Sequence, residues 1–170
     1  SMWENWFEKY IFVILFALGS IAYANVLNEE FLWDDITLIV QNESIRQSIL
    51  SWENFTDWFS SGADGGASPL YRPLPTIIRA ILYTIFGLKP FAFHGLNILL
   101  HICNAFFIFK LLKKLGLAAI GCALAAVAFL LHPVHTESVS YMAGLPDVLV
   151  TFWILLGLNV FLGKEKGNWF

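Results

Sequence analysis

The sequence predicts an all-α integral membrane protein with four transmembrane helices and an outer loop that carries interfacial helices. Of its 170 residues, 58% are apolar and only 14% are charged, whereas an ordinary soluble domain is about half apolar and about a quarter charged. The mean hydropathy of +0.66 excludes a disordered chain. The net charge of -3 gives no basic field, so nucleic acid is not an expected partner.

Four apolar stretches define the spans of one membrane domain that covers 1–170. The first, 10–27, has no charged residue and as a helix would be about 27 Å long, close to the hydrocarbon thickness of a bilayer. A signal peptide is the alternative, but acidic residues and a single Lys9 stand where a basic flank is needed. The other spans are predicted at 91–112, 117–131 and 148–162.

Lysines predict the orientation of these spans. They lie at the end of the second span, between it and the third, and after the fourth, at Lys110, Lys113, Lys114, Lys164 and Lys166. The positive-inside rule places them and the N-terminus in the cytoplasm. The loop 28–90 and the short segment 131–147 then face the outer or lumenal side together.

The outer loop is predicted to contain two further features. The stretch 76–88 (TIIRAILYTIFGL) has one charge on an apolar helical pattern, which indicates a helix lying in the membrane interface. The stretch 61–68 (SGADGGAS) has the composition of a flexible loop.

An acidic pair, Asp34 and Asp35, follows the first span in the motif FLWDD. Two carboxylates at a membrane boundary can supply a general base, bind a metal or begin a solvated loop. In the same outer loop, Arg72 of YRPL can hold a phosphate by charge-assisted hydrogen bonds, or can be an ordinary snorkelling arginine.

A polar stripe runs along the second span, where His94, Asn97, His101 and Asn104 are spaced three, four and three residues apart on one helix face. Polar groups in a bilayer normally face a bundle interior or a wet cavity. The stripe therefore predicts either a functional polar surface or interhelical hydrogen bonds alone.

The third span ends in LHPVHTES, which contains His132, His135 and Glu137. Pro133 breaks the spacing that would place both imidazoles on one helix face, so no metal is assigned. The roles that remain are proton transfer, recognition of sugar hydroxyls or the start of a helix.

These motifs together resemble a known family. FLWDD, YRPL, FHGLNILLH and HPVHTESVSYMAG with Asp147, in this order, resemble the N-terminal membrane part of the transmembrane and tetratricopeptide-repeat (TMTC) protein O-mannosyltransferases. More distantly, the sequence is similar to the protein O-mannosyltransferases of the GT-C fold. The resemblance runs from about Tyr10 to Phe161, and the combination of motifs is specific where any single motif is not.

The resemblance implies a GT-C glycosyltransferase in the bacterial inner membrane or the endoplasmic reticulum membrane. Such an enzyme moves a sugar, typically mannose, from a polyprenyl- or dolichyl-phosphate carrier to a hydroxyl of an acceptor protein on the outer or lumenal face. It implies Asp34 or Asp35 as the base and Arg72 as the phosphate contact. The residues implied for the substrate-binding wall are His94, His132, His135, Glu137 and Asp147. No cofactor is implied, and GT-C enzymes that use monosaccharide phospholipids generally need no divalent metal.

Two departures accompany the resemblance. Relatives usually carry an arginine directly after the glycine of the last motif, whereas Leu145 follows Gly144 here. The family also continues with more helices and often with repeats, so this chain is expected to be part of a longer protein. The alternative function is a non-catalytic polytopic membrane protein, either part of a transporter or a subunit that binds a lipid phosphate.

Overall fold

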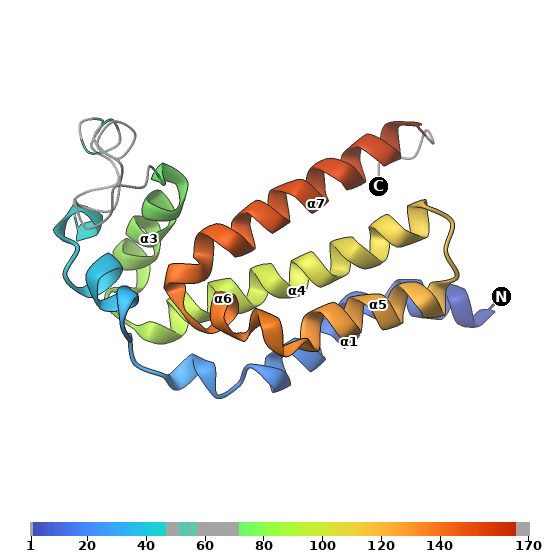
Figure 1. Cartoon of the computed structure of the whole chain (residues 1–170), viewed down its shortest axis with the longest axis horizontal. Coiled ribbons are helices and arrows are strands. Elements are labelled where there is room, and N and C mark those ends of the chain that lie inside the picture. Colours follow the sequence, from blue (N-terminus) through green and yellow to red (C-terminus); the bar gives the residue numbers. More distant parts are fainter. Residues whose placement is uncertain (1, 47–51, 53, 55, 57–71, 166–170) are drawn as a thin grey trace.

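Four long helices run side by side in the structure, a computed structural model that describes residues 2–46, 52, 54, 56 and 72–165 (Figure 1). Helix α4 contacts each of the other three long helices. The start of α1, the end of α7 and the turn between α4 and α5 lie at one end of the molecule (Figure 1). The four helices that run side by side, termed the long helices, are α1 (Met2–Ala22), α4 (Pro90–Lys114), α5 (Ala119–Leu131) and α7 (Leu145–Glu165).

Short helices occupy the opposite end, together with the 14-residue helix α3 (Pro73–Phe86) (Figure 1). This end joins the two segments that were predicted to share one face of the membrane. The short elements are η1 (Val26–Asn28), η2 (Ile36–Val40), η3 (Glu43–Arg46), η4 (Pro133–His135), α6 (Thr136–Ser140) and η5 (Met142–Gly144). The predicted flexible stretch 61–68 lies outside the described residues.

Proline and glycine set several helix boundaries. Pro73 and Pro90 begin α3 and α4, where the missing backbone N–H costs nothing. Pro133 follows the end of α5, because proline cannot continue its hydrogen bonds. Gly87 after α3 and Gly116 after α4 have φ of 65° and 92°, which only glycine adopts without strain.

Two helical segments are long and apolar enough to cross a membrane, namely α4 and the segment Met142–Gly163. The pair Ala119–Leu131 and Pro133–Ser140 is bent by 45° and adds a third candidate if it forms one span. The described residues therefore form an all-helical structure with two or three candidate spans. The predicted helix at 76–88 is present as α3, two or three residues earlier in the chain.

Only part of the first predicted span, 10–27, belongs to a long helix. Helix α1 ends at Ala22 rather than at residue 27, and its apolar part, Lys9–Ala22, is below the length of a span. Directly after the helix, Tyr23 is buried in the core, where its hydroxyl donates a hydrogen bond to the carbonyl of Leu130 at 3.3 Å. The next turn, η1, packs against α4.

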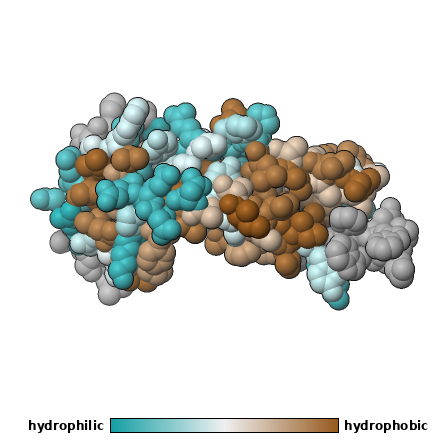
Figure 2. All heavy atoms as spheres, turned by 90° about the horizontal axis from the view of Figure 1, so that it is seen from below, coloured by the Kyte–Doolittle hydropathy of each residue, from teal (hydrophilic) through white to brown (hydrophobic). Residues whose placement is uncertain are grey.

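The surface divides along the long axis of the molecule. Figure 2 shows apolar side chains over the long helices and hydrophilic side chains gathered toward the end with the short helices. Large apolar side chains are exposed on α1, α5 and α7, among them Val13, Leu124, Trp153 and Ile154. Exposed apolar surface of this extent is typical of helices that face lipid.

Candidate functional site

A cavity of about 1020 Å³ opens at the hydrophilic end, between the segment after α1 and the segment from η4 to the start of α7. Three of its lining residues are exposed carboxylates, Asp34, Glu137 and Asp147. Trp33, which is 81% exposed, and Tyr141 add aromatic surface. Carboxylates beside aromatic rings can accept hydrogen bonds from hydroxyl groups while apolar faces of a ligand pack on the rings.

The two neighbouring acids of FLWDD have opposite surroundings. Asp34 is exposed and lines the cavity, whereas Asp35 is only 1% exposed. Asp35 accepts two backbone hydrogen bonds, from Met142 N at 3.1 Å to Oδ2 and from Ala143 N at 2.7 Å to Oδ1. The chain reaches this arrangement through Trp33, whose φ of 52° is uncommon for a residue other than glycine.

Two buried groups lie near the Asp35 carboxylate, Arg79 on α3 and His94 on α4, and each is 1% exposed. Burial raises the pKa of Asp35 above its ordinary value, and the two backbone hydrogen bonds and the charges of His94 and Arg79 oppose that rise. Arg79 was not among the residues predicted for the site. The available signal was that Arg79 is the single charge on the apolar pattern of 76–88.

The raised pKa of Asp35 predicts how stability depends on pH. Unfolded Asp35 releases its proton near pH 4, below the folded group, so the unfolded state binds fewer protons across the interval between the two pKa values. Stability therefore falls as pH rises through this interval. We expect the melting temperature of the wild type, relative to Asp35→Asn, to decrease from about pH 4 upward and then level off. A difference that is constant with pH would contradict this assignment.

The far wall of the cavity is a tight backbone crossing. Gly144 of η5 lies against the backbone of Ser138, where an added Cβ would come within 2.6 Å of the Ser138 Cα. The amide of Tyr141 donates to the carbonyl of Glu137 at 3.2 Å and closes the preceding turn. Only glycine fits at this crossing, so residue 144 fixes how closely η5 approaches α6.

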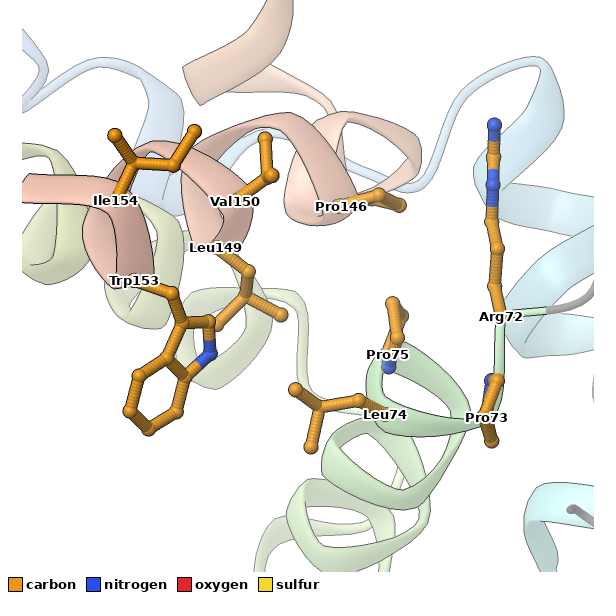
Figure 3. A pocket seen from close by; sticks show the side chains of 9 residues that line it. All are labelled: Arg72, Pro73, Leu74, Pro75, Pro146, Leu149, Val150, Trp153 and Ile154. Atoms are coloured by element: carbon orange, nitrogen blue, oxygen red, sulfur yellow. The ribbon is translucent and has the colours of Figure 1, made fainter. Parts of the chain in front are cut away.

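Arg72 lines a second cavity, of about 460 Å³, between the start of α3 and α7. Figure 3 shows this cavity with mainly apolar side chains around it and with Arg72 on the side away from Trp153. The first two turns of α7 separate the two cavities, because Asp147 lines the first while Pro146, Leu149 and Val150 line the second. The other residues that line the second cavity are Pro73, Leu74, Pro75, Trp153 and Ile154.

The predicted histidines do not line either of these cavities. His132 is exposed, and its Nδ1 accepts a hydrogen bond from the amide of Val134 at 3.2 Å, so it caps η4. The His135 ring packs on Phe129, with ring centroids 4.4 Å apart. No group of three or more His, Cys, Asp or Glu residues in the described ranges is placed to hold a metal ion.

The polar stripe of α4 is buried, and its side chains contact backbone carbonyls of neighbouring elements. Asn97 Nδ2 donates to the carbonyl of Tyr141 at 2.8 Å, and Asn104 Nδ2 donates to that of Val148 at 3.1 Å. His101 Nε2 lies 3.2 Å from the carbonyl of Leu130. These contacts hold the end of α5 and the start of α7 against α4, which favours the interhelical interpretation of the stripe.

Curated relatives match most of this chain. Human "Protein O-mannosyl-transferase TMTC1" is 32% identical over 147 residues, which is 84% of this chain and 17% of the relative. "Protein O-mannosyl-transferase tmtc2" of Xenopus laevis is 32% identical over 149 residues, or 86% of this chain and 18% of the relative. Human "Protein O-mannosyl-transferase TMTC3" is 27% identical over 144 residues, or 84% and 16%.

The chain spans about a sixth of the length of these relatives. No family model and no solved structure matches it. Over the matched residues, the chain belongs to the TMTC family of protein O-mannosyl-transferases.

Proposed function

We propose that this chain forms the reactive cavity of a membrane-bound glycosyltransferase that moves mannose from a polyprenyl-phosphate carrier to a hydroxyl of an acceptor protein. The observation that carries the proposal is the exposed carboxylate of Asp34 in a cavity of about 1020 Å³, beside Glu137 and Asp147. The names of the relatives support mannose as the sugar and a protein as the acceptor.

Asp34 is the base in the proposed reaction. Its carboxylate takes the proton of a serine or threonine hydroxyl as the hydroxyl oxygen attacks C1 of the sugar. The bond between C1 and the phosphate oxygen breaks, the lipid phosphate leaves with the electron pair, and the configuration at C1 inverts. Asp35 is unsuited to this role because its two oxygens are buried and already bonded to Met142 and Ala143. The phosphate activates the sugar, so the reaction requires no organic cofactor.

The second cavity is the proposed place of the lipid donor. Its apolar side chains on α7, Leu149, Val150 and Ile154, suit a polyprenyl chain, and the guanidinium of Arg72 suits a phosphate. The first turns of α7 separate this cavity from Asp34, so a donor held there can present its sugar across the start of α7.

We further propose the topology of a GT-C fold, with four spans and a cytoplasmic N-terminus. Lys110, Lys113 and Lys114 support it, because the end of α4 that carries them lies far from α6, which lines the large cavity (Figure 1). The large cavity then faces the outer or lumenal side, in the endoplasmic reticulum membrane or the bacterial inner membrane.

Arg72→Met tests the donor assignment in transfer assays with the protein expressed from its complete gene. Loss of a charge-assisted hydrogen bond to phosphate is expected to raise the KM for polyprenyl-phosphate mannose at least about tenfold. Lys89→Met, which removes an exposed cation after the other end of α3, is the matched control and is expected to leave KM unchanged.

The assay also separates the alternatives. An unchanged KM in Arg72→Met would remove Arg72 from the donor site. Saturable binding of the lipid donor without any product would instead identify a subunit that binds lipid phosphate, and absence of both would favour the transporter alternative.

A further inference from the structure

Arg79, the buried arginine of α3, contacts the wall of the large cavity without lining the cavity itself. Arg79 is 1% exposed and is not among the residues that line the cavity. Its guanidinium Nη2 donates to the carbonyl of Met142 at 3.5 Å. Met142 belongs to η5, whose next two residues, Ala143 and Gly144, line the cavity. Arg79 therefore contacts the backbone that forms the cavity wall and does not contact the interior of the cavity.

Asp35 also binds the η5 turn, but through backbone amides, whereas Arg79 binds a carbonyl. The amides of Met142 and Ala143 donate to the Asp35 carboxylate at 3.1 and 2.7 Å, while the carbonyl of Met142 accepts from Arg79. An acid and a base are thus buried within reach of each other's charge, with one backbone turn between them. Burial of a charge is costly unless opposite charges and hydrogen bonds compensate it, and the charges of His94 and Arg79 contribute to this compensation for Asp35.

The two hydrogen bonds of Asp35 join opposite walls of the cavity. Asp34, which lines one wall, directly precedes Asp35. Ala143, Gly144 and Asp147 belong to the opposite wall, more than 100 residues later in the chain. A shift of η5 would therefore change the separation between Asp34 and Asp147. A displacement of about 1 Å in such a geometry is enough to reduce a rate about 100-fold.

We propose that Arg79 and Asp35 act as one unit of positioning residues, which holds η5 and thereby sets the place of Asp34 relative to Asp147. The effect on catalysis rests on the proposed transfer reaction, whereas the effect on η5 does not. His94 is the other buried titratable group near Asp35 and approaches it from α4.

Hydrogen exchange at the η5 turn tests the unit without any assay of activity. In Arg79→Met, which keeps a side chain of similar volume, and in Asp35→Asn, the amides of Met142 and Ala143 are expected to exchange at least about tenfold faster than in the wild type. Arg79→Lys keeps the charge and is expected to preserve most of the protection. Unchanged exchange in either Arg79→Met or Asp35→Asn would overturn the proposal.

Transfer kinetics test the catalytic consequence. Arg79→Met is expected to lower kcat at least about tenfold with little change in the KM for the lipid donor, because the substrate contacts remain and only their alignment is lost. The double variant Arg79→Met/Asp35→Asn is expected to be no slower than Asp35→Asn, since the two residues act together.

Three outcomes separate the possibilities. A raised KM with unchanged kcat in Arg79→Met would overturn the proposal and make Arg79 a donor contact. Additive losses in the double variant would show two independent residues and would also overturn it. Absence of transfer by the wild type, with the expected hydrogen exchange, would refute the proposed function and leave the structural unit supported.

Discussion

Asparagine in place of Asp34 is expected to lower the rate of sugar transfer at least about 100-fold, because the amide cannot take the proton of the acceptor hydroxyl. Asp34 is exposed, so the variant is expected to keep the melting temperature of the wild type. The measurement is kcat with a saturating lipid donor, for protein expressed from its complete gene. A rate within about threefold of the wild type would exclude Asp34 as the base.

Two variants serve as controls for Asp34→Asn. Glu30→Gln removes an exposed carboxylate from the same segment, outside the lining of the cavity, and is expected to retain full activity. Asp35→Asn is expected to lose activity together with hydrogen-exchange protection of η5, because the buried carboxylate holds that turn. The two neighbouring acids are thus distinguished by whether structure changes along with rate.

Alanine at Gly144 is expected to be among the most damaging single substitutions in this chain. Its Cβ would lie 2.6 Å from the Cα and 2.7 Å from the carbonyl carbon of Ser138, and it would also meet the Ser138 oxygen. These are backbone atoms, so the clash can be relieved only by moving η5 away from α6. We expect a loss of about 3 kcal/mol in the free energy of unfolding and a loss of transfer.

Gly121→Ala on α5 is the matched control, because nothing lies within 4 Å of its added Cβ. Alanine favours a helix over glycine by about 1 kcal/mol, so this variant is expected to be neutral or slightly more stable. Thermal unfolding of both variants in the same detergent makes the comparison. A melting temperature for Gly144→Ala equal to that of Gly121→Ala would contradict the tight crossing at Ser138.

The long apolar elements were predictable because composition determines them directly. The prediction at 91–112 corresponds to α4 at Pro90–Lys114, and that at 76–88 corresponds to α3. The end of α1 was not predictable from composition, since the residues after Ala22 remain apolar as the chain turns. The hydrogen bond of Tyr23 to Leu130, 107 residues away, has no local sequence signal.

The candidate site was predictable in its residue types but not in their division of roles. Adjacency in FLWDD gives no indication that Asp34 faces the cavity while Asp35 binds the backbone 107 and 108 residues later. Arg79 has the sequence pattern of an interfacial arginine. Its partner Met142 lies 63 residues away, so no local signal indicates that Arg79 is buried. The spacing of the stripe correctly placed Asn97 and Asn104 on one face, but the carbonyls they bind become available only in the folded chain.

Transfer itself is the most direct test of the central claim that this chain carries the reactive cavity of a mannosyltransferase. Protein expressed from its complete gene and reconstituted in liposomes would receive polyprenyl-phosphate mannose labelled in the sugar, with a protein acceptor rich in serine and threonine. We expect label on acceptor hydroxyls, an equal amount of released lipid phosphate, and loss of both in Asp34→Asn. Transfer that persists in Asp34→Asn would exclude Asp34 as the base, and absence of transfer with every polyprenyl-phosphate sugar offered to well-folded wild type would exclude a mannosyltransferase.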